Sequence, residues 1–435
     1  MKKLLLWTVT LMLVATFSLV GCKAVPEAVE VEKVEEEVAV VEEEEVAVVE
    51  EAPGDDEYDL TYYCIMSILP DFDKWLSDVE SATGLKINVI AAPIDADMRQ
   101  QKVSTVLSAG DSSIDILDIN DEMATSFKNT GWLEPLQDTV LTDDIIDNFP
   151  QVYIADMSTS EDGDIIALPG PYCGYLSFWV DQAKLDKYGF KSIDTKEDFI
   201  AFAKAASEDG NFGYGGSWEK TYVFNEIGTF VNLFGGDYFD WTNPANKEAI
   251  QFMYDMVNTW KVTPIDQIAD RYEQMDQKFI DGKYAMLFMW GTGQNYKDAE
   301  RYGEDQIHLA QMPQFTTRSV FIASWCHSLN SASENKEAAI KVLQYMASEE
   351  GEMSAWNNFD NYPARADVAQ LLPDNDVKDM FSLYAETCVA RGRPMLPQTM
   401  EFITDIGTIF QSCMQGKITV DEFCVQAQQY VEKYK

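Results

Sequence analysis

Residues 60–92 have the sequence LTYYCIMSILPDFDKWLSDVESATGLKINVIAA, and this stretch decides the fold class. Residues 60–66 are rich in β-forming side chains and predict a strand. The apolar residues that follow are spaced i, i+3, i+4, i+7 on one helix face: Phe72, Trp75, Leu76 and Val79. Gly84 ends this helix, and residues 86–92 predict a second strand. A strand, a helix and a strand in succession are typical of an α/β protein.

The same alternation continues along the chain. Residues 97–109 predict a helix and residues 114–119 a strand, so the opening is a βαβαβ unit, which builds a parallel sheet with helices on both faces. Further helices are expected after Thr195, whose Asp198 completes a capping box, at 247–260, after a cap at Ser331 or Ser333, and at 420–434.

The N-terminal residues have the pattern of a secretory signal. Lys2 and Lys3 precede an uncharged apolar run from residue 4 to residue 20. Leu19-Val20-Gly21-Cys22 resembles a bacterial lipobox, in which the cysteine is acylated and becomes the new N-terminus. We therefore expect a lipoprotein signal peptide at 1–21 and lipidation at Cys22. A plain signal peptide or a single anchor helix are the alternatives.

An acidic low-complexity segment follows at 22–57. The octapeptide EEEVAVVE occurs twice in succession, at 35–42 and at 43–50. Like charges at this density repel one another and keep a chain extended. We interpret the segment as a tether that holds a folded body away from a membrane, with a specific interaction tail as the alternative.

Charge excludes one class of partner. The formal net charge is −42, with 74 acidic residues against 32 lysines and arginines. Nucleic-acid phosphates require a basic surface, so we expect no nucleic acid, and a highly anionic ligand is disfavoured. The six cysteines beyond Cys22 have no CxxC or other metal-site spacing, and both disulfides and buried thiols remain open.

Catalytic motifs are missing from the sequence. The only histidines are His308 and His327, and neither lies in a ligand pattern. The sequence has no G-x-S-x-G elbow, no phosphate loop and no dinucleotide fingerprint. No pair of carboxylates stands out for glycoside hydrolysis. The chain is therefore predicted to bind a ligand rather than to catalyse a reaction, without a cofactor or metal.

Several segments resemble, in order and spacing, the family 1 extracellular solute-binding proteins of ABC transporters, the maltose-binding-like group. The resemblance covers about residues 58–435, and these segments carry it: GWLEPL at 131–136, IALP at 166–169, residues 175–181 with Asp198-Phe199, FIDGKYAM at 279–286, residues 333–348, YPAR at 362–365 and residues 416–427. One departure is Trp179-Val180-Asp181 in place of the usual Tyr-Asn-Lys.

This resemblance implies a type II periplasmic-binding-protein-like fold, with two α/β lobes and a hinge that the chain crosses three times. By position we place the crossings near 168, 317 and 361. The N-terminal lobe is then 58–168 together with 318–360, and the C-terminal lobe is 169–317 together with 361–435. The ligand would lie in the cleft between the lobes, which close over it.

Sugars present apolar faces and hydroxyls, so a sugar site needs flat aromatic rings and planar polar groups. Loops that follow strands are the favoured positions. The resulting candidates for ligand binding are Asn120, Asp121, Glu122, Tyr172, Trp218, Tyr222, Trp290, Trp325, Arg365 and Glu401. Three alternatives stay open: a helix N-cap at 120–122, core packing for Trp290 and a hinge salt bridge for Arg365.

The combined hypothesis is a monomeric, lipid-anchored, extracytoplasmic protein that captures a mono- or oligosaccharide and delivers it to ABC permease transmembrane subunits. A polyamine or other cation is the alternative ligand for the same fold. A surface glycosidase and an accessory protein of a membrane sensor are the alternatives from other classes.

The lipobox makes a direct prediction. Cys22→Ala removes the acceptor for the acyl chains, which would otherwise hold the protein on the membrane. The variant should therefore appear in the soluble fraction after cell fractionation, while the wild type sediments with membranes. Cys388→Ala is a suitable control, and equal sedimentation of the wild type and Cys22→Ala would contradict lipidation.

Overall fold

The computed structural model describes residues 58–93 and 95–435, together with the side chains of these residues except those of 97, 156 and 171–173. The expected signal peptide, Cys22 and the acidic tether lie outside the described residues. Among the described residues, none of the helices combines the length and the apolar character that spanning a membrane requires.

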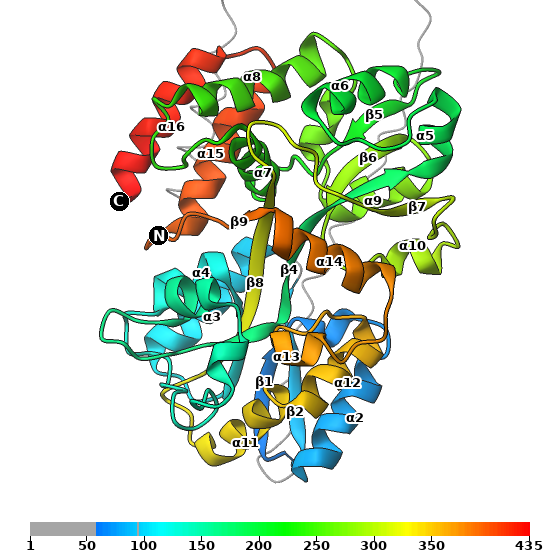
Figure 1. The fold of residues 1–435 in the computed structure, drawn as a ribbon. Helices are drawn as coiled ribbons and strands as arrows, with labels where there is room; N and C mark the ends of the chain where they lie inside the picture. The colour runs from blue at the N-terminus through cyan, green and yellow to red at the C-terminus, as the bar shows by residue number, and fades with distance from the viewer. Residues whose placement is uncertain (1–57, 94) are drawn as a thin grey trace, which may run out of the picture. The chain divides into compact units, whose positions relative to one another are not determined.

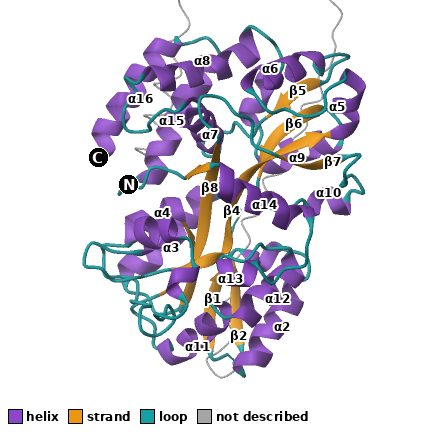
Figure 2. Ribbon diagram, viewed as in Figure 1, coloured by secondary structure: helices purple, strands orange, loops and turns teal. Residues whose placement is uncertain are grey.

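A nine-stranded sheet connects two α/β lobes (Figures 1 and 2). Its strand order is β2-β1-β3-β8-β4-β6-β5, with β7 paired to β4 and β9 paired to β8. β4 (Leu168–Asp181) and β8 (Ser319–Leu329) lie at the centre of this order and extend into both lobes. We call the lobe that contains β1–β3 the first lobe and the lobe that contains β5–β7 the second lobe.

The first lobe begins with the predicted βαβαβ unit. β1 pairs with β2 and with β3, and both pairings are parallel. The strands and helices of this lobe are β1 (Leu60–Cys64), β2 (Ile87–Ala91), β3 (Ile116–Asn120), α2 (Phe72–Thr83), α3 (Ala96–Ala109), α4 (Asp121–Phe127), α11 (Lys336–Met346), α12 (Glu349–Phe359) and α13 (Ala366–Ala369). Short helical turns lie at Met66–Ile68, Ile146–Asn148 and Tyr153–Ser158.

The second lobe is richer in helices. Its members are β5 (Phe212–Gly215), β6 (Tyr284–Met289), β7 (Ile307–Ala310), β9 (Val389–Arg391), α5 (Gln182–Tyr188), α6 (Lys196–Ala205), α7 (Phe224–Phe234), α8 (Pro244–Asn258), α9 (Tyr272–Ile280), α10 (Gln294–Asp298), α14 (Asp376–Thr387), α15 (Thr399–Met414) and α16 (Val420–Tyr434), with a 3-10 turn at Ile265–Ala269. The capping box of Thr195 and Asp198 starts α6 as predicted.

The expectation of a parallel sheet is wrong for the centre of the sheet. β3 with β8, β8 with β4, and β4 with β6 are all antiparallel. The physical reason is that β4 carries the chain from the first lobe to the second, whereas β8 carries it back. Two strands that cross the same boundary in opposite directions can pair only in antiparallel fashion.

The expected serine cap on α11 is also wrong. The residue at the N-cap position is Asn335, and its side chain makes no capping hydrogen bond. The Ser333 hydroxyl instead donates to Asp115 at 2.5 Å, and its oxygen accepts the Asn335 amide at 3.0 Å. This serine therefore fixes the loop against β3, just before the helix begins.

The third crossing lies after α13, beyond position 361. Arg365, at the start of α13, donates its backbone amide to Glu352 of α12 and its guanidinium to the Ala347 carbonyl. By contrast, Tyr384 of α14 accepts the Phe178 amide and donates to the Ala310 carbonyl in the second lobe. Residues 361–369 thus pack with the first lobe, and we place the boundary between α13 and α14.

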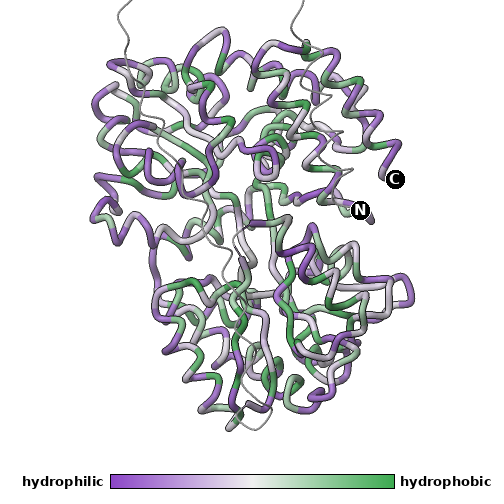
Figure 3. Tube along the Cα trace, turned by 180° about the vertical axis from the view of Figure 1, so that it is seen from behind, coloured by the Kyte–Doolittle hydropathy of each residue, from purple (hydrophilic) through white to green (hydrophobic). Residues whose placement is uncertain are grey.

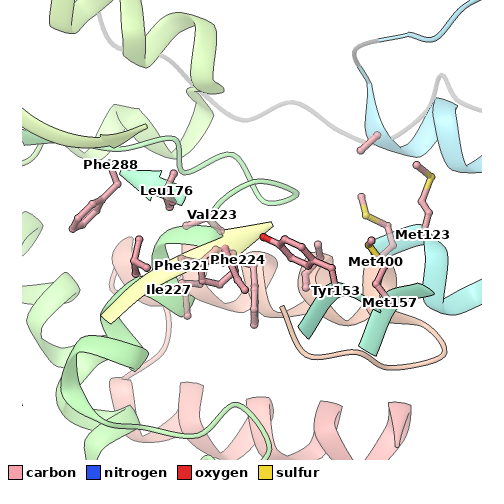
Figure 4. Close-up of a cluster of buried hydrophobic side chains, with 14 of the residues drawn as sticks. Met123, Tyr153, Met157, Leu176, Val223, Phe224, Ile227, Phe288, Phe321 and Met400 are labelled. Carbon is pink, nitrogen blue, oxygen red and sulfur yellow. The ribbon is translucent and has the colours of Figure 1, made fainter. Parts of the chain in front are cut away.

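Apolar residues fill the interior of both lobes. In Figure 3 the hydrophobic segments run through the strands, and the hydrophilic segments lie mainly on the outside. Figure 4 shows Met123, Met157 and Met400 gathered at one end of a buried cluster that continues past Tyr153 to Phe321. Since Met123 lies in α4 and Met400 in α15, this cluster joins the two lobes beside the crossing strands.

His327 has the structural role that its isolation in the sequence suggests. It lies in β8, opposite Asp118 of β3 and Leu168 of β4. Its Nδ1 is 2.7 Å from the Asp118 carboxylate, which also accepts the Tyr62 hydroxyl and the Ile65 amide. The buried aspartate therefore ties β8 to β1 and β3.

Candidate functional site between the lobes

A cavity of about 490 Å³ lies between the lobes, and six of the predicted site residues line it. The first lobe contributes Asn120, Asp121, Glu122 and Trp325, and the second lobe contributes Tyr222 and Trp290. Asn120 and Trp325 are cross-strand partners in β3 and β8, which explains why residues 205 positions apart meet here.

Helix α4 places the polar side chains of the first lobe. Asn120 ends β3, and its side chain accepts the Met123 amide as the N-cap of α4. Asp121 and Glu122 follow in the first turn, and both are buried. The N-cap alternative is thus correct for Asn120, although this residue also lines the cavity. Acidic side chains in the first turn are stabilised by the helix dipole.

Arg393, which the sequence analysis did not single out, holds both carboxylates. Its Nη1 is 2.5 Å from Asp121 Oδ1 and 3.0 Å from Glu122 Oε2, and the Arg393 side chain is only 9% exposed. Burial raises the pKa of Asp121 against the opposing charge of Arg393. Burial acts in the same direction on Glu122, but the charge of Arg393, the hydrogen bond with Asp121 and the charge of Arg99 together outweigh it, so the pKa of Glu122 is lowered.

Aromatic rings surround this ion cluster. The guanidinium of Arg99 lies 5.0 Å from the centre of the Trp325 ring, which is within the range of a cation–π contact. In the second lobe Trp290 follows β6 and approaches Phe321 edge-on. Tyr272 packs edge-on against Tyr222 and accepts a hydrogen bond from Asn225 at 2.8 Å. The cavity therefore combines flat apolar faces with charged and amide groups.

Glycines open the second-lobe wall next to Trp290. Gly291 and Gly293 both have φ near 85°, a left-handed backbone conformation that residues other than glycine rarely adopt. A Cβ on Gly293 would also lie 2.6 Å from the Trp179 ring. These glycines let the backbone of residues 291–293 line the cavity, as the sequence analysis expects.

Three predicted residues lie outside the cavity lining. Trp218 is fully buried, packs edge-on against Phe410, and donates its indole N–H to Glu226 at 2.9 Å. Arg365 forms a two-point pair with Asp367, which is a local ion pair at the start of α13 and not a salt bridge across the hinge. Glu401 is exposed on α15. Tyr172 lies in β4, and its side chain is outside the described part of the chain.

Arg393, Arg99, Asn225 and Tyr272 line the cavity but were not predicted. The amino-acid composition offered one indication of a role for the arginines. Cations are scarce in this acidic chain, so a buried arginine is expected to pair with carboxylates. Periodicity cannot show which carboxylates those are, because Arg393 is 271 residues from Glu122.

A family model described as bacterial extracellular solute-binding protein matches residues 69–353, which is more than half of the chain. The chain belongs to this family. The cavity between the lobes is therefore the candidate binding site of a solute-binding protein.

Solved structures share the fold of this solute-binding protein. Maltose-bound MalE3 of T. maritima is 19% identical, with a TM-score of 0.74 over 86% of this chain and 99% of the other. An ABC transporter solute-binding protein from Thermotoga lettingae TMO, bound with α-D-tagatose, is 21% identical, with a TM-score of 0.74 over 86% and 98%. An ABC substrate-binding protein from Listeria monocytogenes, in complex with cycloalternan, is 19% identical, with a TM-score of 0.72 over 86% and 98%.

Glu226, the buried partner of Trp218, is a titratable group in the interior of this solute-binding protein. Its carboxyl group accepts hydrogen bonds from the Tyr214 hydroxyl, the Ser217 amide and the Trp218 indole N–H. Burial raises its pKa to about 7 despite these three donors. The folded state therefore binds a proton that the unfolded chain loses at about pH 4.3.

Glu226→Gln should remove the part of the pH dependence of the free energy of unfolding that comes from the titration of Glu226. The folded-state pKa is raised, so the contribution of Glu226 is full below about pH 4.3 and is lost as pH rises through about 7. The free energy of unfolding of the wild type, minus that of the variant, should fall by on the order of 3 kcal/mol from pH 4 to pH 8. Urea titrations measure this difference.

Glu401→Gln, at an exposed glutamate, is the matched control for that experiment. Glu352, whose pKa burial raises to about 8, adds a slope in the same direction that Glu226→Gln leaves in place. Parallel stability curves for the wild type and Glu226→Gln would show that Glu226 has the same pKa in the folded and unfolded chain and would contradict the prediction.

Proposed function

We propose that this protein captures a neutral mono- or oligosaccharide between its lobes and delivers it to the transmembrane subunits of an ABC permease. The observation that carries the proposal is the composition of the cavity wall, where Trp290, Trp325 and Tyr222 flank Asp121, Glu122 and Arg393. Aromatic faces suit the C–H faces of a sugar, and charged planar groups suit its hydroxyls.

Charge pairing in the cavity supports a neutral solute over a polyamine. Asp121 and Glu122, which an ammonium group would need, already share Arg393 as their counterion. An incoming dication would have to displace a buried guanidinium, and a polyanion would face the same two carboxylates. The Nε of Arg393 has no acceptor among the described residues, so a solute hydroxyl can accept from it.

The structural neighbours support the same class of solute. Proteins of this fold have been solved with maltose, tagatose and cycloalternan, all of which are uncharged carbohydrates. For this chain we infer the class and not the individual sugar. The extracytoplasmic location belongs to the family, and anchoring through Cys22, the tether and a monomeric state complete the proposal.

A thermal-shift screen of residues 58–435 against neutral sugars, polyamines and amino acids tests the proposed solute class. A solute that binds only the folded state raises the melting temperature by mass action. Trp290→Ala and Trp325→Ala should each weaken binding of the stabilising sugar by more than about tenfold, because each removes an aromatic wall worth over 1.4 kcal/mol. Isothermal titration calorimetry measures the loss.

Trp132→Ala is the matched control, since this half-buried tryptophan packs against Phe127 away from the cavity. Stabilisation by spermidine and by no sugar would overturn the choice of solute. If Trp290→Ala and Trp325→Ala both bind the sugar normally, the binding site does not lie in this cavity. Turnover of a chromogenic glycoside, lost on substitution of one carboxylate, would establish the glycosidase alternative.

A further inference from the structure

Two ion pairs join the lobes away from the cavity floor. Arg271, the N-cap residue of α9 in the second lobe, places Nη2 3.3 Å from Asp95 Oδ2, and Asp95 is the N-cap of α3 in the first lobe. Lys297 of α10 in the second lobe places Nζ 2.7 Å from Asp360 Oδ2, at the end of α12 in the first lobe.

These pairs lie at the rim of the cavity. Asp95, Arg271 and Lys297 are absent from its lining, whereas Asp360 and the adjacent residues Ala96, Tyr272 and Tyr296 belong to it. The Lys297 contact is reinforced by Thr292, whose hydroxyl donates to the Asp360 carbonyl at 3.1 Å. Each pair therefore depends on the distance between the lobes. Neither member of the Arg271–Asp95 pair lines the cavity, whereas Asp360 of the second pair does.

The charge of the chain makes such contacts significant. Residues 58–435 contain 59 acidic residues against 28 lysines and arginines, so two lobes brought close together repel each other. Arg271 and Lys297 bring two of the scarce cations of the second lobe to carboxylates of the first. A hinge rotation that opens the cleft would separate all four groups, because each pair has one member in each lobe.

We propose that the Arg271–Asp95 and Lys297–Asp360 pairs form an electrostatic latch that stabilises the closed arrangement of the lobes. The latch contributes to closure before any solute is present and slows the escape of a bound one. This inference goes beyond the proposed function, since it holds for any solute.

The size of the effect follows from exposure. The four side chains are between 26% and 37% exposed, so each pair is partly screened by water. Pairs of this kind change an equilibrium by about two- to fivefold. That is enough to shift the ratio of closed to open protein measurably without locking the cleft.

Asp95→Asn is the decisive variant, because it separates the latch from general repulsion. It removes one negative charge from an acidic lobe, so repulsion alone predicts more closed protein, whereas the latch predicts less. Asparagine also retains the capping of α3, in which Asp95 accepts the Met98 amide. The helix should therefore keep its start.

Single-molecule FRET on the full chain without solute measures the closed fraction. Dyes on unnatural amino acids at Ser81 and Glu248 report the lobe separation, since both positions are exposed and lie in different lobes. The closed-to-open ratio should fall about two- to fivefold in Asp95→Asn and in Lys297→Met, and further in the double variant. Added NaCl should shrink these differences, since salt screens exposed charges.

Asp71→Asn is the matched control, because it removes the same charge from a pair with Lys74 inside the first lobe. In a protein that already carries Asp95→Asn, Arg271→Gln should not lower the closed-to-open ratio further. This result would assign the loss of closed protein to the Arg271–Asp95 pair. A closed fraction that rises in Asp95→Asn, or that matches the control, would overturn the latch. Because no sugar is used, failure of the proposed solute class leaves this result unchanged.

Discussion

The antiparallel pairing of β4 with β8 is the constraint on which the rest of the molecule depends. Leu168 and Leu176 of β4 face His327 and Phe321 of β8, so one pair of strands extends from the first lobe into the second. The register shifts between Pro169 and Cys173, where Gly170 has φ 136°. An irregularity at one point of the pairing gives the two lobes a place at which they can share a sheet and still change their relative angle.

Strand β8 also builds the binding site. Its pairing with β3 brings Trp325 opposite Asn120, and the return of the chain through α14 and β9 carries Arg393 to the N-terminus of α4. Each wall of the cavity belongs to a different lobe. A solute in the cavity therefore gains its full set of contacts only when the lobes are close, which is the differential affinity that drives closure.

Electrostatics operates at three places between the lobes. Arg393 pairs with the carboxyl groups of both Asp121 and Glu122 at the cavity floor, and Arg271 and Lys297 meet carboxylates at the rim. The floor cluster is desolvated, so it determines which charges a solute can carry. The rim pairs are exposed to water and salt, so they influence the equilibrium between open and closed protein rather than solute identity.

The sequence by itself determined the α/β class, the helices and strands of the βαβαβ unit, the start of α6 and the extent of α16, because these depend on local periodicity and capping. It also predicted six residues of the cavity wall, since polar and aromatic residues follow strands. Only the tertiary structure decided that Trp218 is buried with its indole N–H donating to Glu226, that Arg365 pairs with Asp367, and that Arg393 bridges Asp121 and Glu122. Burial and ion pairing between residues far apart depend on how β4 and β8 return the chain, and no local pattern records that path.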